Sequence, residues 1–489
     1  MEMFDYAVVG GGVGGVLASA LLSKLGRSVI LFESLSYLGG CAGTFKKDGF
    51  YYNAGATTIT GLEEPMPLGK ILSFLEVSPA LKELPMSMQV LVMDKRINLW
   101  WDSERLLQEL DSNFKGVANY KLLSELKSSS HRLWQTLWKF LPFSGYTSIL
   151  GFFLRHPFEA IQQLLWYARG GQTFKSYIAG HQDYRQLLDY ISLITSQGFL
   201  KEVSYAVALL GLSYPINKTY YSFGGMSNLI ESIAKVIPTI YRKTTVFKVI
   251  KADGYFLLET SKGQFRAKRV ILNTTIWNLE DLVEIDSVKE FSRKAKRVYS
   301  KAWSAITLYA KVKKERAKDL PSHILILEEE PLSVGGTKEL FLSLSLPEDS
   351  TMSSQEYLSL TVSTHARPEL WENITKEDYD MRKELIKEEI LCKIYKKLPA
   401  LKGAIQNAFV GTPKTFERYT KRYKGLVGGV PMVRKYFPFR YPLPFTTVDG
   451  LFLVGDTVFP GQGLLGVSVG VINLLLSIEK DFRECWSYA

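Results

Sequence analysis

The chain has 489 residues, which suits two or three structural domains and is too long for one simple core. Hydrophobic residues make up 46% and charged residues 22%, a globular composition that excludes extensive intrinsic disorder. The net charge of +11 fits an anionic membrane surface or simple solubility, whereas nucleic acid is disfavoured because no nucleic-acid-binding motif accompanies it.

Cysteine usage and the N-terminus indicate the compartment. Cys41, Cys392 and Cys485 show no metal-ligand spacing and form no disulfide framework, so we expect a reducing compartment and no metal. The N-terminal segment MEMFDYAVVGGG lacks the basic region of a signal peptide, and no stretch has the length of a clean transmembrane helix. We therefore expect a cytoplasmic protein whose membrane contact, if any, is peripheral.

The first predicted element is a nucleotide-binding strand–helix–strand unit that ends at Glu33. Gly10, Gly12 and Gly15 have the G-x-G-x-x-G spacing, which permits a tight turn, close approach of a pyrophosphate and packing of helix on strand. The helix N-terminus then faces the phosphates, and Glu33 can accept hydrogen bonds from a ribose. In this context a glycine-rich turn without a ligand is the weaker alternative.

The next segment favours FAD. Glu33 at the end of the second strand favours an unphosphorylated ribose, hence NAD or FAD over NADP. The glycine cluster LGGCAGTF at 38–45 is similar to the segment that passes along the pyrophosphate and ribityl chain in FAD enzymes of the glutathione-reductase fold. Cys41 is interpreted as a small packing residue, because no second cysteine lies near it.

An apolar, aromatic segment at 133–167 is split by Pro142 and Pro157. Two interpretations stand side by side: an amphipathic surface that enters the lipid interface, and the core of a helical subdomain. His156 and His181, in or near this segment, are more typical of structural than of catalytic histidines.

Further along, YYSFGGMSNL at 220–229 predicts a helix start, and 244–279 predicts a small antiparallel meander that ends near Asn273. The charged run at 376–398 has the spacing of a helix with one solvated face. TPKTFERYTKRYKGLVGGVP at 412–431 precedes the glycine-rich VGDTVFPGQGLLG near the C-terminus.

Together with GGCAGTF and NAGATTITGL, these motifs resemble the carotenoid desaturase and isomerase family, the phytoene desaturase-type flavoproteins. The match follows the same order along nearly the whole chain. The branch that it resembles holds carotenoid 3′,4′-desaturases, carotene isomerases and retinol saturases, and the TFERYT and GGVP segments are the more specific part.

The resemblance implies an α/β (α+β overall) fold: a glutathione-reductase-type FAD Rossmann domain with an inserted mixed-sheet substrate domain and a helical membrane-facing subdomain. The implied division is FAD-binding parts at 1–105, 222–300 and 435–489, a helical substrate part at 106–221 and a second substrate part at 301–434.

The resemblance also implies residue roles. Gly455 and Asp456 would meet the phosphates and ribityl chain, 461–463 would pass the isoalloxazine edge, Val246 would pair with adenine, and Gly466 would begin the last helix. For Gln462, a loop residue that satisfies backbone groups is an equal alternative. The predicted cofactor-binding residues are Gly10, Gly12, Val13, Gly14, Gly15, Glu33, Ser34, Gly39, Gly40, Cys41, Ala42, Gly43, Val246, Asn273, Gly455, Asp456, Gly461, Gln462, Gly463 and Leu464.

Three residues are predicted at the substrate. Asn53 stands where the family usually has Asp, so it keeps the shape and loses the charge. Tyr419 and Arg422 belong to the family-specific run and would line a substrate tunnel, with a plain surface loop as the alternative. No catalytic acid–base pair is identified.

The expected function is an FAD-dependent oxidoreductase or isomerase on a carotenoid or related polyisoprenoid lipid, by desaturation, cis–trans isomerisation or saturation. We expect no obligatory protein partner and no nucleic acid. Two alternatives remain open: an amine-oxidase-like flavoenzyme on a small substrate, and a non-enzymatic prenyl-binding escort on the same fold.

Overall fold

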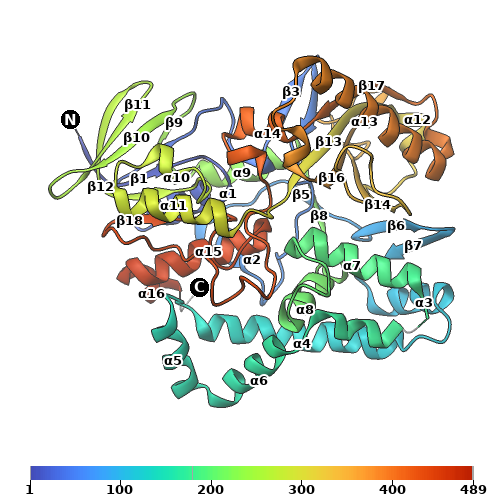
Figure 1. The fold of residues 1–489 in the computed structure, drawn as a ribbon, viewed down its shortest axis with the longest axis horizontal. Coiled ribbons are helices and arrows are strands. Elements are labelled where there is room, and N and C mark those ends of the chain that lie inside the picture. Colours follow the sequence, from blue (N-terminus) through green and yellow to red (C-terminus); the bar gives the residue numbers. More distant parts are fainter. Residues whose placement is uncertain (1, 179, 487–489) are drawn as a thin grey trace.

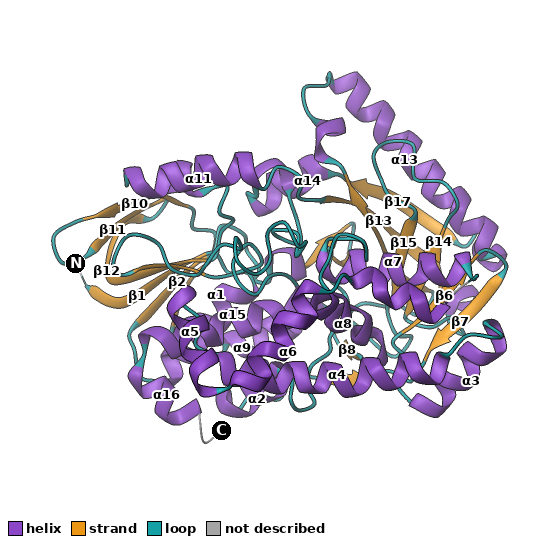
Figure 2. Cartoon of the chain, turned by 60° about the horizontal axis from the view of Figure 1, so that its bottom comes forward, coloured by secondary structure: helices purple, strands orange, loops and turns teal. Residues whose placement is uncertain are grey.

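Two seven-stranded sheets organise the part of the chain that the structure describes, residues 2–178 and 180–486 of a computed structural model (Figure 1). Figure 2 shows them at opposite ends of the molecule, with a layer of helices beneath. Two small pairs of strands complete the sheets: β3 (Thr44–Lys47) with β4 (Phe50–Asn53), and β5 (Leu81–Glu83) with β8 (Tyr220–Ser222). The expected α/β class with a Rossmann-type part is confirmed.

The first sheet contains the predicted strand–helix–strand unit. Strands β1 (Met3–Val9) and β2 (Val29–Phe32) pair in parallel, and α1 (Val13–Lys24) connects them along the chain. The predicted meander is also present, as three antiparallel strands whose last member pairs in parallel with β1. The sheet order is β10 (Val246–Lys251), β11 (Phe256–Thr260), β12 (Gly263–Leu272), β1 (Met3–Val9), β2 (Val29–Phe32) and β9 (Thr239–Tyr241), with β18 (Leu451–Leu453) beside β12.

Both faces of this sheet are covered, which explains why its central strands are uniformly apolar. Tyr6 and Val8 pack into a core with α1, and Ala7 and Val9 pack into a second core on the other face. The first core also receives α2 (Pro67–Leu75), α9 (Met226–Ala234) and α15 (Gly463–Ile478), and the second receives α10 (Leu279–Leu282) and α11 (Asp286–Val298).

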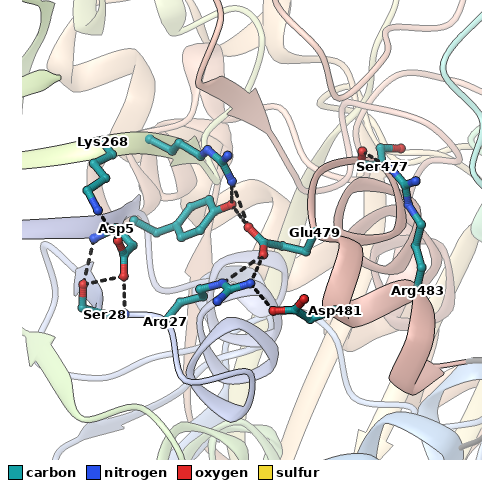
Figure 3. Close-up of polar contacts among 10 residues, drawn as sticks. Asp5, Arg27, Ser28, Lys268, Ser477, Glu479, Asp481 and Arg483 are labelled. Carbon is teal, nitrogen blue, oxygen red and sulfur yellow. Dashed lines mark hydrogen bonds and ion pairs between the residues drawn. The ribbon is translucent and has the colours of Figure 1, made fainter. Parts of the chain in front are cut away.

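A polar cluster beside β1 gathers around Glu479, a buried carboxylate. Glu479, just before α16 (Lys480–Trp486), accepts hydrogen bonds from Arg27 Nε and Nη2 at 2.9 and 2.7 Å and from Arg269 Nη1 at 2.9 Å. The hydroxyl of Tyr6 donates to the same carboxylate. Figure 3 shows this cluster beside the separate contacts of Asp5 with Lys268 and Ser28. The network fixes the C-terminal helices to the first sheet.

The second sheet forms the other end of the molecule and is mostly antiparallel. Its outer face is covered by α13 (Lys376–Lys397), the predicted helix of the charged run. The order is β17 (Ile405–Gly411), β13 (Ser304–Lys313), β16 (Tyr357–Ala366), β15 (Glu339–Leu344), β14 (His323–Leu327), β6 (Met88–Val92) and β7 (Lys95–Leu99), with α12 (Lys314–Ala317) and α14 (Pro413–Thr420) at its margin.

A helical layer lies between and beneath the sheets. The prolines divide it as predicted, since one helix ends before Pro142 and another begins at Pro157. None of the described helices combines the length and hydropathy that crossing a bilayer requires. The helices are α3 (Ser103–Asn113), α4 (Asn119–Phe140), α5 (Tyr146–Arg155), α6 (Pro157–Ala168), α7 (Gln182–Ser196) and α8 (Tyr205–Ser213).

Two details differ from the expectations. Strands β6 and β7 fall in the segment 1–105 that was assigned to cofactor binding, yet β6 pairs in parallel with β14 of the second sheet. The helix α15, which was expected to begin at Gly466 and to be the last, begins at Gly463 and is followed by α16. Gly466 instead sits in the first turn of α15, where a Cβ would lie 2.7 Å from the carbonyl oxygen of Gly461, so the lack of a side chain lets the preceding loop pass close to the helix.

Candidate functional site

A cavity of about 800 Å³ connects the first sheet to the second. Its walls come from segments that are far apart in the sequence: the glycine turn after β1, the end of β12, the loop before α15, the inner faces of α7 and α8, and strands of the second sheet. One end is rich in backbone and glycine, and the other is formed by side chains. The two ends therefore offer different chemistry to whatever binds.

The glycine turn after β1 is shaped by a close backbone crossing. A Cβ on Gly15 would lie 2.0 Å from the carbonyl oxygen of Gly10. A Cβ on Gly12 would lie 2.9 Å from the side-chain nitrogen Nδ2 of Asn273. Asn273 donates from Nδ2 to Gly10 O at 3.1 Å, which fixes the turn to the end of β12. Gly10 and Gly12 line the cavity, whereas Gly15 packs helix on strand behind it, in the role predicted from its spacing.

Two helix N-termini open onto this end of the cavity. Neither α1, which follows Gly12, nor α15, which follows Gln462, has a capping side-chain hydrogen bond from any described residue. Val13, Gly14, Gly463 and Leu464 line the cavity at these two ends. Free N–H groups and the positive ends of two helix dipoles suit the negative charge of a pyrophosphate.

Glu33 lies at the cavity beside the glycine turn and is almost completely buried. Its Oε2 accepts from Gly11 N at 2.8 Å, and its Oε1 accepts from Leu35 N at 2.7 Å and from Ser34 Oγ at 3.1 Å. These bonds hold the carboxylate in a fixed place with acceptor capacity left for a ribose hydroxyl. Val246 lines the cavity at the same end.

The second glycine segment crosses the cavity next to the turn. Gly39, Gly40, Cys41 and Ala42 line it, whereas Gly43 lies outside, where a Cβ would meet the ring of Tyr37 at 2.7 Å. Burial raises the pKa of the Cys41 thiol, so the group is a neutral packing residue, in agreement with its interpretation from the sequence.

The C-terminal motif contributes an ion pair. Arg422 Nη2 lies 2.8 and 2.7 Å from the two carboxylate oxygens of Asp456, and Arg422 Nη1 donates to Leu426 O at 3.0 Å. Burial alone lowers the pKa of Arg422, but the adjacent Asp456 outweighs it and raises the pKa above the ordinary value. Both residues line the cavity together with Gly455. Arg422 therefore lies at the glycine-rich end of the cavity, whereas the resemblance assigned it to a substrate tunnel.

The loop before α15 joins the two ends of the cavity. Gln462 donates from Nε2 to Ile194 O at 3.0 Å and accepts at Oε1 from Gln197 Nε2 at 3.0 Å. It therefore satisfies a backbone group and lines the cavity at the same time. Gly461 lies outside the cavity, because its position faces the hydroxyl of Tyr441 and the side chain of Met432.

Asn53 does not line the cavity, contrary to its assignment to the substrate. Its Oδ1 accepts from Thr44 Oγ1 at 2.8 Å and from Met226 N at 2.9 Å, so the amide joins the β3–β4 pair to the start of α9. A neutral side chain suffices for both bonds. Tyr419 reaches the cavity margin and remains half exposed.

The other end of the cavity is predominantly apolar. Four helical or strand elements contribute its large side chains, namely α4, α7, α8 and β15. These side chains include Trp134, Leu137, Ile191, Ile194, Leu210 and Phe341. An elongated apolar space suits a hydrocarbon chain.

A polar group that the sequence did not single out lies on this apolar wall. His365 Nδ1 is 2.6 Å from Glu339 Oε1, and His365 Nε2 is 3.0 Å from Gln197 Nε2. The signal was present as alternation, because Glu339 and Phe341 on β15, like Ser363 and His365 on β16, face the cavity two residues apart. Pairing across the sheet, which brings these residues together, is not visible in the sequence.

The comparisons with known proteins agree with this geometry. A family model for an NAD(P)-binding Rossmann-like domain matches residues 8–73. The chain is 27% identical to prolycopene isomerase 2, chloroplastic, of an Oncidium hybrid cultivar, over 98% of this chain and 84% of that protein. It is 25% identical to the all-trans-retinol 13,14-reductase of Danio rerio, over 88% of this chain and 78% of that protein. An oxidoreductase from Methanosarcina mazei shares the fold, with a TM-score of 0.67 and 15% identity over 96% of this chain and 99% of that structure.

These matches extend over nearly the whole chain and involve enzymes, and the Rossmann match covers the glycine turn, Glu33 and the second glycine segment. The glycine turn, the two helix N-termini and the held carboxylate fit a dinucleotide or flavin cofactor. The chain is similar over most of its length to enzymes named prolycopene isomerase, all-trans-retinol 13,14-reductase and 4,4'-diaponeurosporene oxygenase.

Proposed function

We propose that the protein is an FAD-dependent oxidoreductase or isomerase that acts on a carotenoid or related polyisoprenoid lipid. The observation that carries the proposal is the single cavity that joins a glycine-rich cofactor end to an apolar end. FAD, when bound, supplies hydride transfer to or from carbon. Gly10, Gly12 and the helix N-termini would hold its pyrophosphate, and Glu33 would hold its ribose.

The residues of the apolar end would hold and orient the substrate. A polyene has no polar handle, so binding must come from burial of hydrocarbon, worth about 25 cal/mol per Å² of apolar surface. Side chains of α4, α7 and α8 would provide that surface and exclude water from the reacting carbons. Desaturation would use this arrangement with the oxidised cofactor, and saturation or isomerisation would use it with the reduced cofactor.

The amine-oxidase alternative is less well supported by the charges of the cavity. An amine substrate is cationic and needs a free carboxylate or an aromatic cage. Glu339 and Asp456, two carboxylates at the cavity, already pair with His365 and Arg422. The escort alternative is disfavoured by the retained cofactor end, because a prenyl escort has no need of a held Glu33 or of two open helix N-termini.

The direct test is production of the protein in cells that make defined carotenoids, with chromatography of the pigments. A more conjugated product means desaturation, a shifted isomer ratio means isomerisation, and a shorter chromophore means saturation. Flavin absorbance in the purified protein separates an enzyme from an escort. Unchanged carotenoids, with quinone side chains and other prenyl lipids also untouched, would contradict the proposed substrate class.

Membrane contact is part of the same proposal. The helices α5 and α6 expose large apolar side chains, including Leu154 at 78%, Phe158 at 84% and also Tyr146, Leu150, Ile161 and Leu165. Arg155 of α5 is exposed beside them and would meet anionic headgroups, whereas Lys139 of α4 pairs with Glu159 of α6 at 2.9 Å. Phe140 of α4 packs edge-on against Phe152 of α5, and Trp134 and Leu137 of α4 line the cavity. A lipid substrate would therefore pass from the bilayer to the cavity along α4.

A further inference from the structure

A chain of four hydrogen-bonded side chains crosses the cavity wall from the second sheet to the loop before α15. Its members are Glu339 on β15, His365 on β16, Gln197 after α7, and Gln462. Phe341 pairs with Ser363 in the β15–β16 ladder, and the same register two residues on sets Glu339 opposite His365. All four residues line the cavity.

The hydrogen bonds fix the protonation of His365. The carbonyl of Ile194 can only accept, so the nitrogen of Gln462 faces it and Oε1 of Gln462 faces Gln197. Gln197 must then present Nε2 to Gln462, and the same nitrogen lies 3.0 Å from His365 Nε2. An amide N–H needs a lone pair to bond with. His365 therefore holds its proton on Nδ1 and its lone pair on Nε2.

Glu339 holds the imidazole in this form. The carboxylate is only 1% exposed, and its Oε1 receives the Nδ1–H at 2.6 Å and the backbone N–H of His365 at 3.0 Å. Its Oε2 receives the hydroxyl of Thr337. With only donors around it, the carboxylate is anionic, and a buried anion at Nδ1 stabilises the imidazolium that forms when Nε2 takes a proton.

Beyond these hydrogen bonds, His365 contacts an aromatic ring. The rings of His365 and Trp303 meet edge to face with their centroids 5.7 Å apart, and the guanidinium carbon of Arg367 lies over the Trp303 ring, 3.5 Å from its centroid. Tyr190 lies near Glu339, and burial, followed by that carboxylate, raises the pKa of the phenol. Tyr190 is therefore neutral, and Glu339 is the charge in direct contact with the ring.

One atom among these four side chains has no hydrogen-bond partner. Gln197 Oε1 is buried and accepts no hydrogen bond from any described residue. A rotation of the amide would bring this oxygen to His365 Nε2 once that nitrogen carries a proton, at the cost of the bond from Gln197 Nε2 to Gln462 Oε1.

We infer that His365 is the catalytic residue that carries the substrate proton, with Glu339 as its positioning residue; the inference rests on the proposed function. In desaturation, the C–H bond of one carbon breaks and its proton goes to Nε2 of His365. The electron pair of that bond would form the new π bond while the neighbouring carbon lost a hydride, for which oxidised FAD would supply the acceptor. Saturation would be the reverse, in which Nε2 of the imidazolium would return the proton and the reduced cofactor would be the hydride source.

The first test uses the tautomer of His365 and needs no substrate. The chain has five histidines, so selective 15N-histidine labelling gives few signals, and His365→Asn assigns the relevant pair. We expect the neutral imidazole to carry its proton on Nδ1 in wild type, and a larger share of the Nε2-protonated tautomer in Glu339→Gln, which loses the carboxylate acceptor at Nδ1. An Nε2-protonated neutral ring in wild type, or a tautomer ratio that Glu339→Gln leaves unchanged, would overturn the inference.

The second test uses turnover. In flavin-loaded enzyme, His365→Asn should lower kcat by about 10²- to 10⁴-fold, with KM and the flavin spectrum unchanged. Glu339→Gln should lower kcat less than His365→Asn does, with KM unchanged, because the imidazole remains but loses the carboxylate that positions it. His131→Asn, an exposed histidine on α4, is the matched control and should leave kcat unchanged.

The two tests separate the possible failures. If wild-type protein converts no polyisoprenoid, the proposed function fails while the 15N signals still decide the tautomer of His365. If wild type is active and His365→Asn, shown to be folded and flavin-loaded, keeps kcat within about threefold, His365 does not carry the proton and the inference is wrong.

Discussion

Arg422 donates from one nitrogen, Nη2, to both carboxylate oxygens of Asp456, at 2.8 and 2.7 Å. Both residues line the glycine-rich end of the cavity. The pair joins the family-specific run at 412–431 to the C-terminal glycine motif. The two charged groups are largely shielded from solvent, so the charge of each is stabilised by the other.

Asp456→Asn should therefore destabilise the apoprotein by about 1.5–3 kcal/mol, because it leaves a largely shielded guanidinium without its counter-charge. Urea unfolding of apoprotein measures this directly. Arg422→Lys, which keeps the positive charge beside Asp456, should lower the free energy of unfolding by less. Flavin affinity should fall in both variants. An Asp456→Asn apoprotein as stable as wild type would show that the ion pair contributes nothing to folding and that Asp456 serves the cofactor alone.

Gly15→Ala should disturb the glycine turn. The new Cβ would lie 2.0 Å from the backbone oxygen of Gly10, so helix and turn must separate, at a cost of about 1–3 kcal/mol for overpacking. Flavin binding should weaken with it, measured by absorbance after dialysis. Gly151→Ala on α5 is the matched control, because the nearest atom to its Cβ is the flexible Arg155 guanidinium at 3.9 Å. That variant should be neutral or up to about 1 kcal/mol more stable through helix propensity. Equal behaviour of the two variants would contradict the steric argument.

His323 should make the protein sensitive to mild acid. Its ring is buried against Phe341, and burial lowers its pKa to about 4, below the value of 6.5 for a free side chain. Between those values the unfolded chain binds the proton and the folded chain does not. The contribution of the neutral ring is thus complete above pH 6.5 and is lost as the pH falls toward 4.

The measurement is the free energy of unfolding at pH 7 and pH 5. Wild type should lose about 2 kcal/mol more than His323→Leu over this interval, at about 1.4 kcal/mol per pH unit of the titration window. His131→Asn, which removes an exposed histidine, should follow wild type. Parallel curves for wild type and His323→Leu would mean that His323 does not titrate in this window.

The apolar surface of α5 and α6 should bind lipid vesicles. We expect flotation with vesicles of phosphatidylcholine and phosphatidylglycerol, and a loss of more than about tenfold in binding for Leu154→Asp combined with Phe158→Asp, since each buried side chain is worth about 1.5–3 kcal/mol. Leu385→Asp on α13 replaces a leucine that is 52% exposed on a distant helix (Figure 1) and should bind as wild type does. If both sets of variants float like wild type, this surface does not contact the membrane.

The cluster around Glu479 (Figure 3) should matter more than the surface pair next to it. Glu479→Gln weakens bonds to Arg27, Arg269 and Tyr6 and should cost about 1.5–3 kcal/mol, as for buried hydrogen bonds to charged groups. Asp481→Asn removes one exposed contact to Arg27 and should cost at most about 1 kcal/mol. Thermal unfolding of the two variants compares them, and an equal loss would show that burial of Glu479 is unimportant.

The sequence by itself determined the features that depend on neighbours in the chain. The spacing of Gly10, Gly12 and Gly15 between two apolar strands specifies the turn and its helix, because tight turns and helix starts are local. Pro142 and Pro157 fixed where the helices of the apolar segment end and begin for the same reason. The meander at 244–279 followed from alternation and short turns.

Tertiary structure alone decided the contacts between distant segments. Strands at 88–99 joined the second sheet, Asn53 turned to the start of α9 and away from the cavity, and Glu339 came to face His365. Each of these depends on which strands pair and in which register. That choice is set by the burial of whole faces, which no local pattern of residues encodes.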